Sequence, residues 1–264
     1  MSKLDTAPYK GVQDLYPEDM VKQNYVFSVW RKVAHQFNYQ EYSASILEPA
    51  ELYKEKSGEE IVNEQTFKFT DRGGRDVVLR PEMTPTLARM VAARRKSLKY
   101  PLRWYSIPNL FRYEKPQRGR RREHWQLNVD LLGVSGIEAD VEIITLADTI
   151  MQTFGAKRED YEIRMHTMSD TTHDLDQVMH KLKEKGITNI KLDHSFKRGQ
   201  AYYTGIVFEF YDTNPENPRS ILGGGRYDNL MELFDEEHLP AVGFGAGDIT
   251  IKDFLETHGL ATHA

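Results

Sequence analysis

The residues best suited to chemistry lie between positions 111 and 133, where a basic loop separates two strand-like segments. In the second segment, polar side chains occupy every other position, at Gln126, Asn128 and Asp130, with apolar residues between them. Because successive side chains of a strand point to opposite faces, these three polar groups share one face. A polar face of this kind either lines a cleft or faces water.

The loop before that strand is strongly basic. Its positive charges are carried by Lys115, Arg118, Arg120, Arg121 and Arg122. A guanidinium can bind two phosphate oxygens at once, so the loop suits a polyphosphate lying on a sheet. Taken alone, a basic hairpin loop is more often a solvated turn or a nonspecific anion patch. The polar strand beside it favours a defined phosphate site.

Composition sets the broad class of protein. The chain has 264 residues, of which 39% are hydrophobic and 28% charged, values ordinary for a globular protein of one large or two small domains. It has no cysteine, which excludes disulfides and cysteine-ligated zinc and fits a reducing cytoplasm. No apolar run is long enough to cross a membrane. The net charge of −5 argues against a general polyanion-binding surface.

Hydrophobic periodicity predicts the elements that must position these groups. Helices are expected over residues 19–37, 84–95 (with Thr84 as N-cap), 139–154 and 173–186. Strands are expected over residues 42–47, 66–69, 77–79, 104–112, 161–165, 190–192 and 202–210. A glycine-rich turn and a helix are expected from Ile221 to about Phe234, and residues 243–247 are glycine-rich again. Strands with helices between and behind them predict an α+β domain around a mainly antiparallel sheet.

Three segments resemble one known family. Residues 111–133 resemble motif 2 of the class II aminoacyl-tRNA synthetases, in the form used by histidyl-tRNA synthetases. RPEMT at residues 80–84 resembles that family's amino-acid-binding strip. FKRGQAYYTGIVFE at residues 196–209, with GGGRYD at residues 223–228, resembles its histidine-specific motifs. The resemblance implies a class II synthetase-like catalytic domain over residues 1–264, with a mainly antiparallel sheet flanked by helices.

The resemblance implies a reaction and its partners. It implies that histidine is activated with ATP, accompanied by Mg²⁺, and transferred to tRNA(His) by a cytoplasmic homodimer. The implied ATP-binding residues are Arg112, Glu114, Arg120, His124, Gly245 and Gly247. Arg112 would hold the α-phosphate and the amino-acid carboxylate, and Glu114 would accept from the adenine amino group. Arg120 would reach the outer phosphates, and His124 would stack on adenine.

The same resemblance implies a histidine site. Its residues are Glu82, Thr84, Gln126, Asp130, Tyr202, Tyr203 and Gly224. Asp130 would accept from an imidazole N–H, and Tyr203 would bond the other ring nitrogen. Glu82, Thr84 and Gln126 would bind the α-ammonium group, which needs partners when it is buried. Each residue alone has a structural alternative; Glu82, for instance, could simply begin a helix, where an acid suits the helix dipole.

Arg198 is implied as a second catalytic residue beside Arg112, stabilising the α-phosphate. Ala201 stands where the family motif has an aspartate, which weakens the support around Arg198. Arg121 and Arg122 have weaker claims and are expected to be solvated or to face tRNA. The histidines form no convincing metal set, so the only metal expected is Mg²⁺ bound with ATP.

The chain departs from the family pattern in three places. Thr250 stands where motif 3 normally has an arginine, the insertion at about residues 167–193 is strongly reduced, and no anticodon-binding domain is expected. The alternative is a related regulatory subunit of ATP phosphoribosyltransferase, which binds histidine or a partner and does not charge tRNA. Such subunits tend to lose the ATP-binding residues, whereas Arg112, Glu114 and Arg120 are present, so the ligase is favoured. A bare tRNA-binding module is disfavoured by the acidic net charge.

Overall fold

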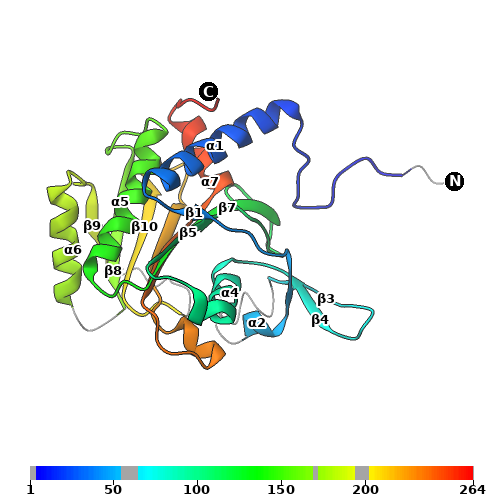
Figure 1. Ribbon diagram of the computed structural model, residues 1–264. Helices are drawn as coiled ribbons and strands as arrows, with labels where there is room; N and C mark the ends of the chain where they lie inside the picture. The colour runs from blue at the N-terminus through cyan, green and yellow to red at the C-terminus, as the bar shows by residue number, and fades with distance from the viewer. Residues whose placement is uncertain (1–3, 55–64, 169–171, 194–201, 264) are drawn as a thin grey trace.

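The computed structural model describes residues 4–54, 65–168, 172–193 and 202–263 (Figure 1). Its helices are α1 (Pro17–Gln36), α2 (Glu51–Lys54), α4 (Thr84–Arg94), α5 (Ile137–Thr153), α6 (Thr172–Glu184) and α7 (Asp248–Thr257), with the 3-10 helices η1 (Arg95–Ser97) and η2 (Leu230–Phe234). Its strands are β1 (Gln40–Glu41), β2 (Leu47–Pro49), β3 (Phe67–Thr70), β4 (Asp76–Leu79), β5 (Leu102–Ser106), β6 (Asn109–Phe111), β7 (Glu123–Leu132), β8 (Tyr161–Thr167), β9 (Ile190–Leu192), β10 (Ile206–Asp212), β11 (Ser220–Arg226) and β12 (Ala241–Gly247).

One large sheet organises the described residues. Its strand order is β1-β5-β7-β12-β11-β10-β8-β9, and β6 also pairs with β7. The two outermost pairs, β1–β5 and β8–β9, are parallel, and the other neighbours are antiparallel. This confirms the predicted α+β fold with a mainly antiparallel sheet.

Helices α1, α5 and α7 cover one face of this sheet (Figure 1). In α5, Ile143, Leu146 and Ile150 recur at helical spacing and are fully buried. Residues from α1 and α7 and the apolar positions of β7 join the same core. Each such leucine or isoleucine stabilises the fold by roughly 1.5–3 kcal/mol. The apolar face of β7 is thereby fixed against the helices, which turns its polar face to the opposite side.

The opposite face of the sheet carries a smaller apolar cluster and leaves room for a site. Leu87 and Val91 of α4 pack with Leu230 and Met231 of η2 near one end of the sheet. Beyond this cluster, β7 presents its polar side chains. The start of α4 therefore faces the polar side of β7 across the site described below.

The predicted strand over residues 42–47 was wrong. The main sheet takes only β1, and the chain then passes to β2, which forms a separate three-stranded sheet in the order β2-β4-β3. In the crossing segment, the carbonyls of Ala44 and Ser45 accept hydrogen bonds from the guanidinium of Arg80 at 2.8 and 3.2 Å. A side chain thus satisfies backbone groups that a strand partner would otherwise have to satisfy.

The glycine-rich turn predicted from Ile221 was wrong, because residues 221–225 lie in β11, and the helix predicted after it is only the short η2. The second glycine-rich stretch, residues 243–247, lies in β12 at the centre of the sheet. Glycine is uncommon inside strands and often marks close approach of another group. A side chain on Gly243 or Gly245 would collide with neighbours, as shown below, so bare backbone is what the packing requires.

Smaller differences concern element ends. The strand predicted over residues 104–112 is divided into β5 and β6, and the Pro108 carbonyl between them accepts from the Gln126 N–H at 3.0 Å. The strand predicted over residues 202–210 begins at Ile206. Thr84, predicted as the N-cap, is the first residue of α4, and Met83 is the N-cap.

The segment predicted to be a reduced insertion contains α6 and β9. Helix α6 packs against α5 and β8, and β9 pairs with β8 in parallel, so both elements extend the main fold. In the part of the chain that the structure describes, no helix is both long and apolar enough to cross a membrane.

Candidate active site

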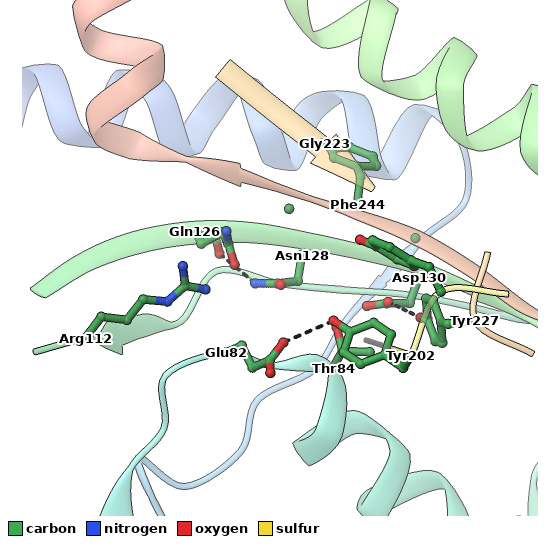
Figure 2. Close-up of a pocket in the computed structure, with 13 residues that line it drawn as sticks. Glu82, Thr84, Arg112, Gln126, Asn128, Asp130, Tyr202, Gly223, Tyr227 and Phe244 are labelled. Atoms are coloured by element: carbon green, nitrogen blue, oxygen red, sulfur yellow. Dashed lines mark hydrogen bonds between the residues drawn. The ribbon is translucent and has the colours of Figure 1, made fainter. Parts of the chain in front are cut away.

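A cleft that is partly open to solvent lies on the open face of the main sheet (Figure 2). Its walls come from the start of α4, the end of β6, β7, β11, β12 and the residues before β10. The lining residues are Glu82, Thr84, Arg112, Gln126, Asn128, Asp130, Tyr202, Tyr203, Gly223, Tyr227, Gly243, Phe244 and Gly245. Segments far apart in the sequence thus converge on the polar face of β7.

The polar face of β7 forms one wall, as its period-two pattern predicted. Gln126, Asn128 and Asp130 all line the cleft, whereas Leu127 and Val129 are buried in the helix-covered core. The strand is fixed on both sides by antiparallel pairing with β5 and β12. The wall is consequently part of the rigid centre of the sheet.

Bare backbone on β12 makes room for those side chains. A Cβ on Gly243 would lie 2.5 Å from Asp130 Oδ1, and a Cβ on Gly245 would lie 2.8 Å from Gln126 Cδ. Both separations are far inside van der Waals contact. The glycines of β12 therefore allow the polar side chains of the neighbouring strand to lie across the sheet.

Asp130 is a buried acid in the cleft. It is 3% exposed and accepts a hydrogen bond from the hydroxyl of Tyr227. Burial raises the pKa of Asp130 to about 7, although the Tyr227 hydrogen bond partly opposes the rise. A carboxyl group at the end of a cleft, with a pKa near neutral pH, suits a ligand that carries an N–H group or a positive charge.

Glu82 and Tyr202 form a second buried polar pair. The Tyr202 hydroxyl donates to Glu82 Oε2 at 3.0 Å, and Glu82 is 4% exposed (Figure 2). The backbone of Glu82 is held as well, because its carbonyl accepts from the Tyr53 hydroxyl at 3.1 Å. Burial raises the pKa of Tyr202 and of its neighbour Tyr203 well above the ordinary value, so both hydroxyls stay protonated as donors.

Arg112 lies at the other end of the cleft from Asp130 and Tyr227 (Figure 2). Its Nε donates to the Pro81 carbonyl at 2.8 Å, which leaves the outer part of the guanidinium directed at the cleft. Pro81 immediately precedes Glu82, so a single hydrogen bond ties the cationic and anionic groups of the cleft to each other. The arrangement can hold a carboxylate or phosphate near Arg112 and an ammonium near Glu82.

Three predicted ATP residues lie beside the cleft without lining it. Glu114 and Arg120 form an ion pair, with Arg120 Nε 3.2 Å from the Glu114 carboxylate. His124 pairs with Leu110 across β6 and β7. Burial, with a contribution from the charge of Arg112, lowers the pKa of His124 to about 3, so the ring is neutral at physiological pH. A neutral aromatic ring next to a cation remains compatible with stacking on a base.

Other predicted site residues lie elsewhere. Gly223, not Gly224, lines the cleft; a Cβ on Gly224 would collide with Phe244 and the Gly243 carbonyl across the sheet. Gly247 is the N-cap of α7, and Arg198 lies outside the described residues.

The expectation that Arg122 is solvated or faces tRNA was wrong. Arg122 is 8% exposed and is hydrogen-bonded to the main chain. The reason is that residues 9–11 cover it, a contact between distant segments that spacing along the sequence cannot reveal.

Thr250 occupies the place where the motif 3 arginine was expected. Its hydroxyl donates to the Ile221 carbonyl at 2.8 Å, which ties α7 to β11. The side chain of Arg219 lies close to the same spot, 2.8 Å from the position that a Cβ of Gly119 would take. Arg118, Arg219 and Thr250 line a small hollow there.

Sequence reasoning missed several lining residues. Asn128 was recognised on the polar face of β7 but was given no role, and Tyr227 was quoted within the GGGRYD segment without one. Gly243 and Phe244 contribute mainly through their place in adjacent strands. A signal for Tyr227 existed in its glycine-rich context, but only the pairing of β11 with β12 and β7 brings it to Asp130.

The cleft thus suits an amino acid with a nitrogen-bearing side chain. Arg112 can neutralise its carboxylate, Glu82 can bind its ammonium group, and Asp130 can accept from its side chain. Among the described residues, no group of three or more His, Cys, Asp or Glu side chains is arranged to hold a metal ion.

Comparisons with known proteins agree with this geometry. A sequence model of the family described as histidyl-tRNA synthetase matches residues 11–163 and 156–248. The histidine–tRNA ligase of Leptospira biflexa is 39% identical, over 98% of this chain and 76% of that protein. The histidine–tRNA ligase of Thermoplasma volcanium is 38% identical, over 97% of this chain and 76% of that protein.

A solved structure shows the same family likeness. The apo histidyl-tRNA synthetase of S. aureus superposes with a TM-score of 0.83 at 27% identity, covering 99% of this chain and 72% of that one. The Leptospira alignment runs over 331 positions although this chain has 264 residues, so that relative carries segments without a counterpart here. With a family model that matches most of its length and a relative 39% identical over nearly all of it, this chain belongs to the histidyl-tRNA synthetase family.

Proposed function

We propose that this protein activates histidine with ATP and transfers it to tRNA(His). A carboxylate oxygen of histidine attacks the α-phosphorus of ATP, the bond to the β-phosphate oxygen breaks, and pyrophosphate leaves. The observation that supports this best is the cleft itself, which places a guanidinium at one end and a buried carboxyl group at the other. Such a site works by positioning and charge neutralisation and needs no covalent intermediate on the enzyme.

Within this proposal the β7 side of the cleft binds histidine. Asp130 accepts from an imidazole N–H, with Tyr227 bonded to the same carboxyl group. Tyr203 bonds the other ring nitrogen, and Glu82, Thr84 and Gln126 hold the α-ammonium group. The support is that all of these residues line one cleft and that both Glu82 and Asp130 are buried there.

ATP is proposed to bind at the Arg112 end. Arg112 contacts the α-phosphate, Glu114 accepts from the adenine amino group, and Arg120 leaves its ion pair with Glu114 to reach the outer phosphates. His124 stacks on adenine, and the backbone at Gly245 and Gly247 lies alongside. Mg²⁺ would bind the phosphates and spread their negative charge. Arg198 remains a proposed second contact to the α-phosphate.

A homodimer is proposed from the three-stranded sheet. Cross-strand partners share a face, so Leu47, Leu79 and Phe67 form one row and Pro49, Val77 and Phe69 form the next. This face is apolar, and Leu47 and Phe69 are 48% and 46% exposed. An apolar sheet face open to solvent fits a second copy of the chain. A monomer mass in light scattering of the purified chain would contradict this.

Two further parts of the proposal concern organisation and place. We regard residues 1–264 as one catalytic domain whose insertion is reduced at about residues 167–193. Support comes from α6 and β9, which join the main fold, and from the family match, which is divided into two parts that meet at residues 156–163. A cytoplasmic location stays a prediction, for which fractionation of cells would be the test.

The direct test is exchange of labelled pyrophosphate into ATP. Exchange is expected with histidine and not with the other amino acids, and chelation of Mg²⁺ should abolish it. A folded chain that binds histidine in calorimetry but supports no exchange would contradict the ligase and would fit a regulatory role. Charging of tRNA(His) is the second measurement, because exchange alone reports only the first step.

A further inference from the structure

The N-terminal segment lies against the base of the basic loop. We call residues 9–12 the strap and residues 112–122 the arm. The strap is a turn closed by the Val12 N–H, which donates to the Tyr9 carbonyl at 3.1 Å. The backbone N–H of Arg122 donates to the Gly11 carbonyl at 2.7 Å. Two stretches separated by about a hundred residues are therefore joined through their main chains.

The side chain of Arg122 reinforces that junction. Its Nη1 donates to the Tyr9 hydroxyl at 2.9 Å and to the Lys10 carbonyl at 3.2 Å. Its guanidinium also lies over two rings, with Cζ 3.9 Å from the centre of Tyr113 and 5.5 Å from that of Tyr9. Cation–π contacts of this kind contribute about 0.5–2 kcal/mol, more when the cation is desolvated. Although Tyr9 is 56% exposed, Arg122 is 8% exposed, so the two rings and the strap shield the cation from water.

Gly11 suits this junction because it has no Cβ. Its φ is +90°, in the region that favours glycine. A Cβ at this position would lie 2.8 Å from Arg122 Cγ and Cδ and 2.9 Å from Pro116 Cγ. The strap backbone thus touches both the outgoing and the returning halves of the arm.

Arg122 passes this contact on to the residues proposed to bind ATP. Its carbonyl accepts from the Arg112 N–H at 2.9 Å, and its Nε donates to the Glu114 carbonyl at 3.2 Å. Arg122 is therefore the common partner of the strap and of the two arm residues that the proposed function assigns to the α-phosphate and adenine. Its backbone N–H, Nε and Nη1 are all directed at the protein's own oxygens, which argues against a role in contacting tRNA.

We propose that the strap and Arg122 fix the position of the arm, so that Arg122 is a positioning residue for ATP binding. The effect on ATP rests on the proposed function, whereas the mechanical role does not. The β7 wall is fixed separately, by strand pairing on both sides. Loosening the strap should therefore disturb the ATP end of the cleft and spare the histidine end.

The test compares strap variants with a matched control in pyrophosphate exchange. Gly11→Ala and Arg122→Ala should raise the KM for ATP by about tenfold or more and leave the KM for histidine within about twofold, because misplacing groups by about 1 Å costs up to about a hundredfold. Tyr9→Phe, which removes one acceptor at an exposed position, should raise the KM for ATP about threefold. Tyr16→Phe, at an exposed tyrosine outside the strap, should change neither value.

A conservative replacement sharpens the assignment of Arg122. Arg122→Lys keeps the charge but lacks the planar fork that reaches several oxygens at once, so it should not restore the KM for ATP. Full recovery in that variant would show that charge alone matters and would overturn the positioning role. Equal rises in both KM values for folded Gly11→Ala would also overturn it.

Hydrogen exchange of backbone amides separates this proposal from the proposed function. Gly11→Ala should speed exchange in residues 112–122 and leave β7 unchanged. If the wild-type protein supports no pyrophosphate exchange, the proposed function fails, but faster amide exchange confined to the arm would still support the strap. Unchanged amide exchange in the arm would overturn the strap, whatever the enzyme activity. Because Tyr9 is exposed, Tyr9→Phe gives the same comparison in a variant expected to fold.

Discussion

The two halves of the cleft are built differently. The β7 wall lies inside the sheet, paired on both sides, and its Asn128 and Asp130 are 6% and 3% exposed. The arm leaves the sheet after β6 and contains only an isolated bridge between Gln117 and Arg120. The side chain of Arg120 is 37% exposed. The wall is held by the regular hydrogen bonds of the sheet. The arm is held by a few main-chain and side-chain contacts at its base and by side-chain contacts at its tip.

This difference has a physical meaning. At the tip, Arg118 donates to Asn217 at 3.1 Å and to Thr257 at 3.3 Å. Such exposed contacts are worth little each and open easily. A selective amino-acid site benefits from rigidity, because discrimination depends on fixed partners. A site for a large, charged nucleotide needs groups that can move aside and close again.

The largest expected effect concerns the residue that links the two halves. Arg112→Ala should lower kcat/KM for pyrophosphate exchange by about a thousandfold, the scale seen when a group that stabilises transition-state charge is removed. The fold should survive, since the side chain makes one hydrogen bond to Pro81. The measurement is steady-state exchange with thermal unfolding as a control. A loss below about tenfold would mean that Arg112 does not contact the reacting phosphate.

The next largest effect is expected at Asp130 in the β7 wall. Asp130→Asn should raise the KM for histidine by about tenfold to a hundredfold, because a buried acceptor with charge is replaced by a neutral amide. The KM for ATP should stay within about twofold if the two ends of the cleft are independent. Comparable increases in both KM values would break the distinction between wall and arm.

The same variant carries a pH signature. The pKa of Asp130 is raised from 3.8 to about 7 in the folded protein, so between these values the folded state holds a proton that the unfolded state has released. The contribution of Asp130 to the free energy of unfolding should therefore fall as pH rises through this window and level off above it. Asp130→Asn lacks this fall. Urea unfolding at pH 4, 6 and 8 should show that the free energy of unfolding of the variant rises relative to that of the wild type as pH increases. A constant difference between the two proteins would contradict the raised pKa.

A smaller effect is expected from Gly245 of β12, which lies against Gln126 of the β7 wall. Gly245→Ala would place a methyl group 2.8 Å from Gln126 Cδ, so the Gln126 side chain must swing away. The KM for histidine should rise about tenfold, since one partner of the ammonium group is displaced. Gly74→Ala, at an exposed turn outside the cleft where φ is +78°, should lower stability and leave both KM values unchanged, so it separates a loss of stability from a loss of binding. Unaltered histidine binding in Gly245→Ala would remove Gln126 from the site.

The smallest effect should come from the arm. Arg120→Ala should raise the KM for ATP by about threefold to fivefold, because its side chain is more than a third exposed and its ion pair is screened by water. The effect should shrink at high salt, where exposed charges interact more weakly. A change in the KM for histidine instead of ATP would reverse the assignment of the two halves.

Local sequence patterns predicted much of this structure. The helix from Ile137 to Thr153 was anticipated almost to its ends, and the polar face of β7 was anticipated residue by residue, because both depend on periodicities of 3.6 and 2. The turn predicted at residues 223–225 failed because a glycine-rich sequence fits both a turn and a strand that is crowded by its neighbours. The segment at residues 42–47 failed because Arg80, not a strand, supplies its hydrogen bonds.

The sequence by itself determined the fold class, the polar strand and most of the lining residues, since each can be recognised from short-range spacing or from motifs shared with a family. Only the tertiary structure decided which groups meet. Tyr227 reaches Asp130 because β11, β12 and β7 are neighbours in the sheet, and Arg122 is internal because residues 9–11 cover it. These pairings join residues about a hundred positions apart, and their formation depends on the packing of the whole chain rather than on any local preference.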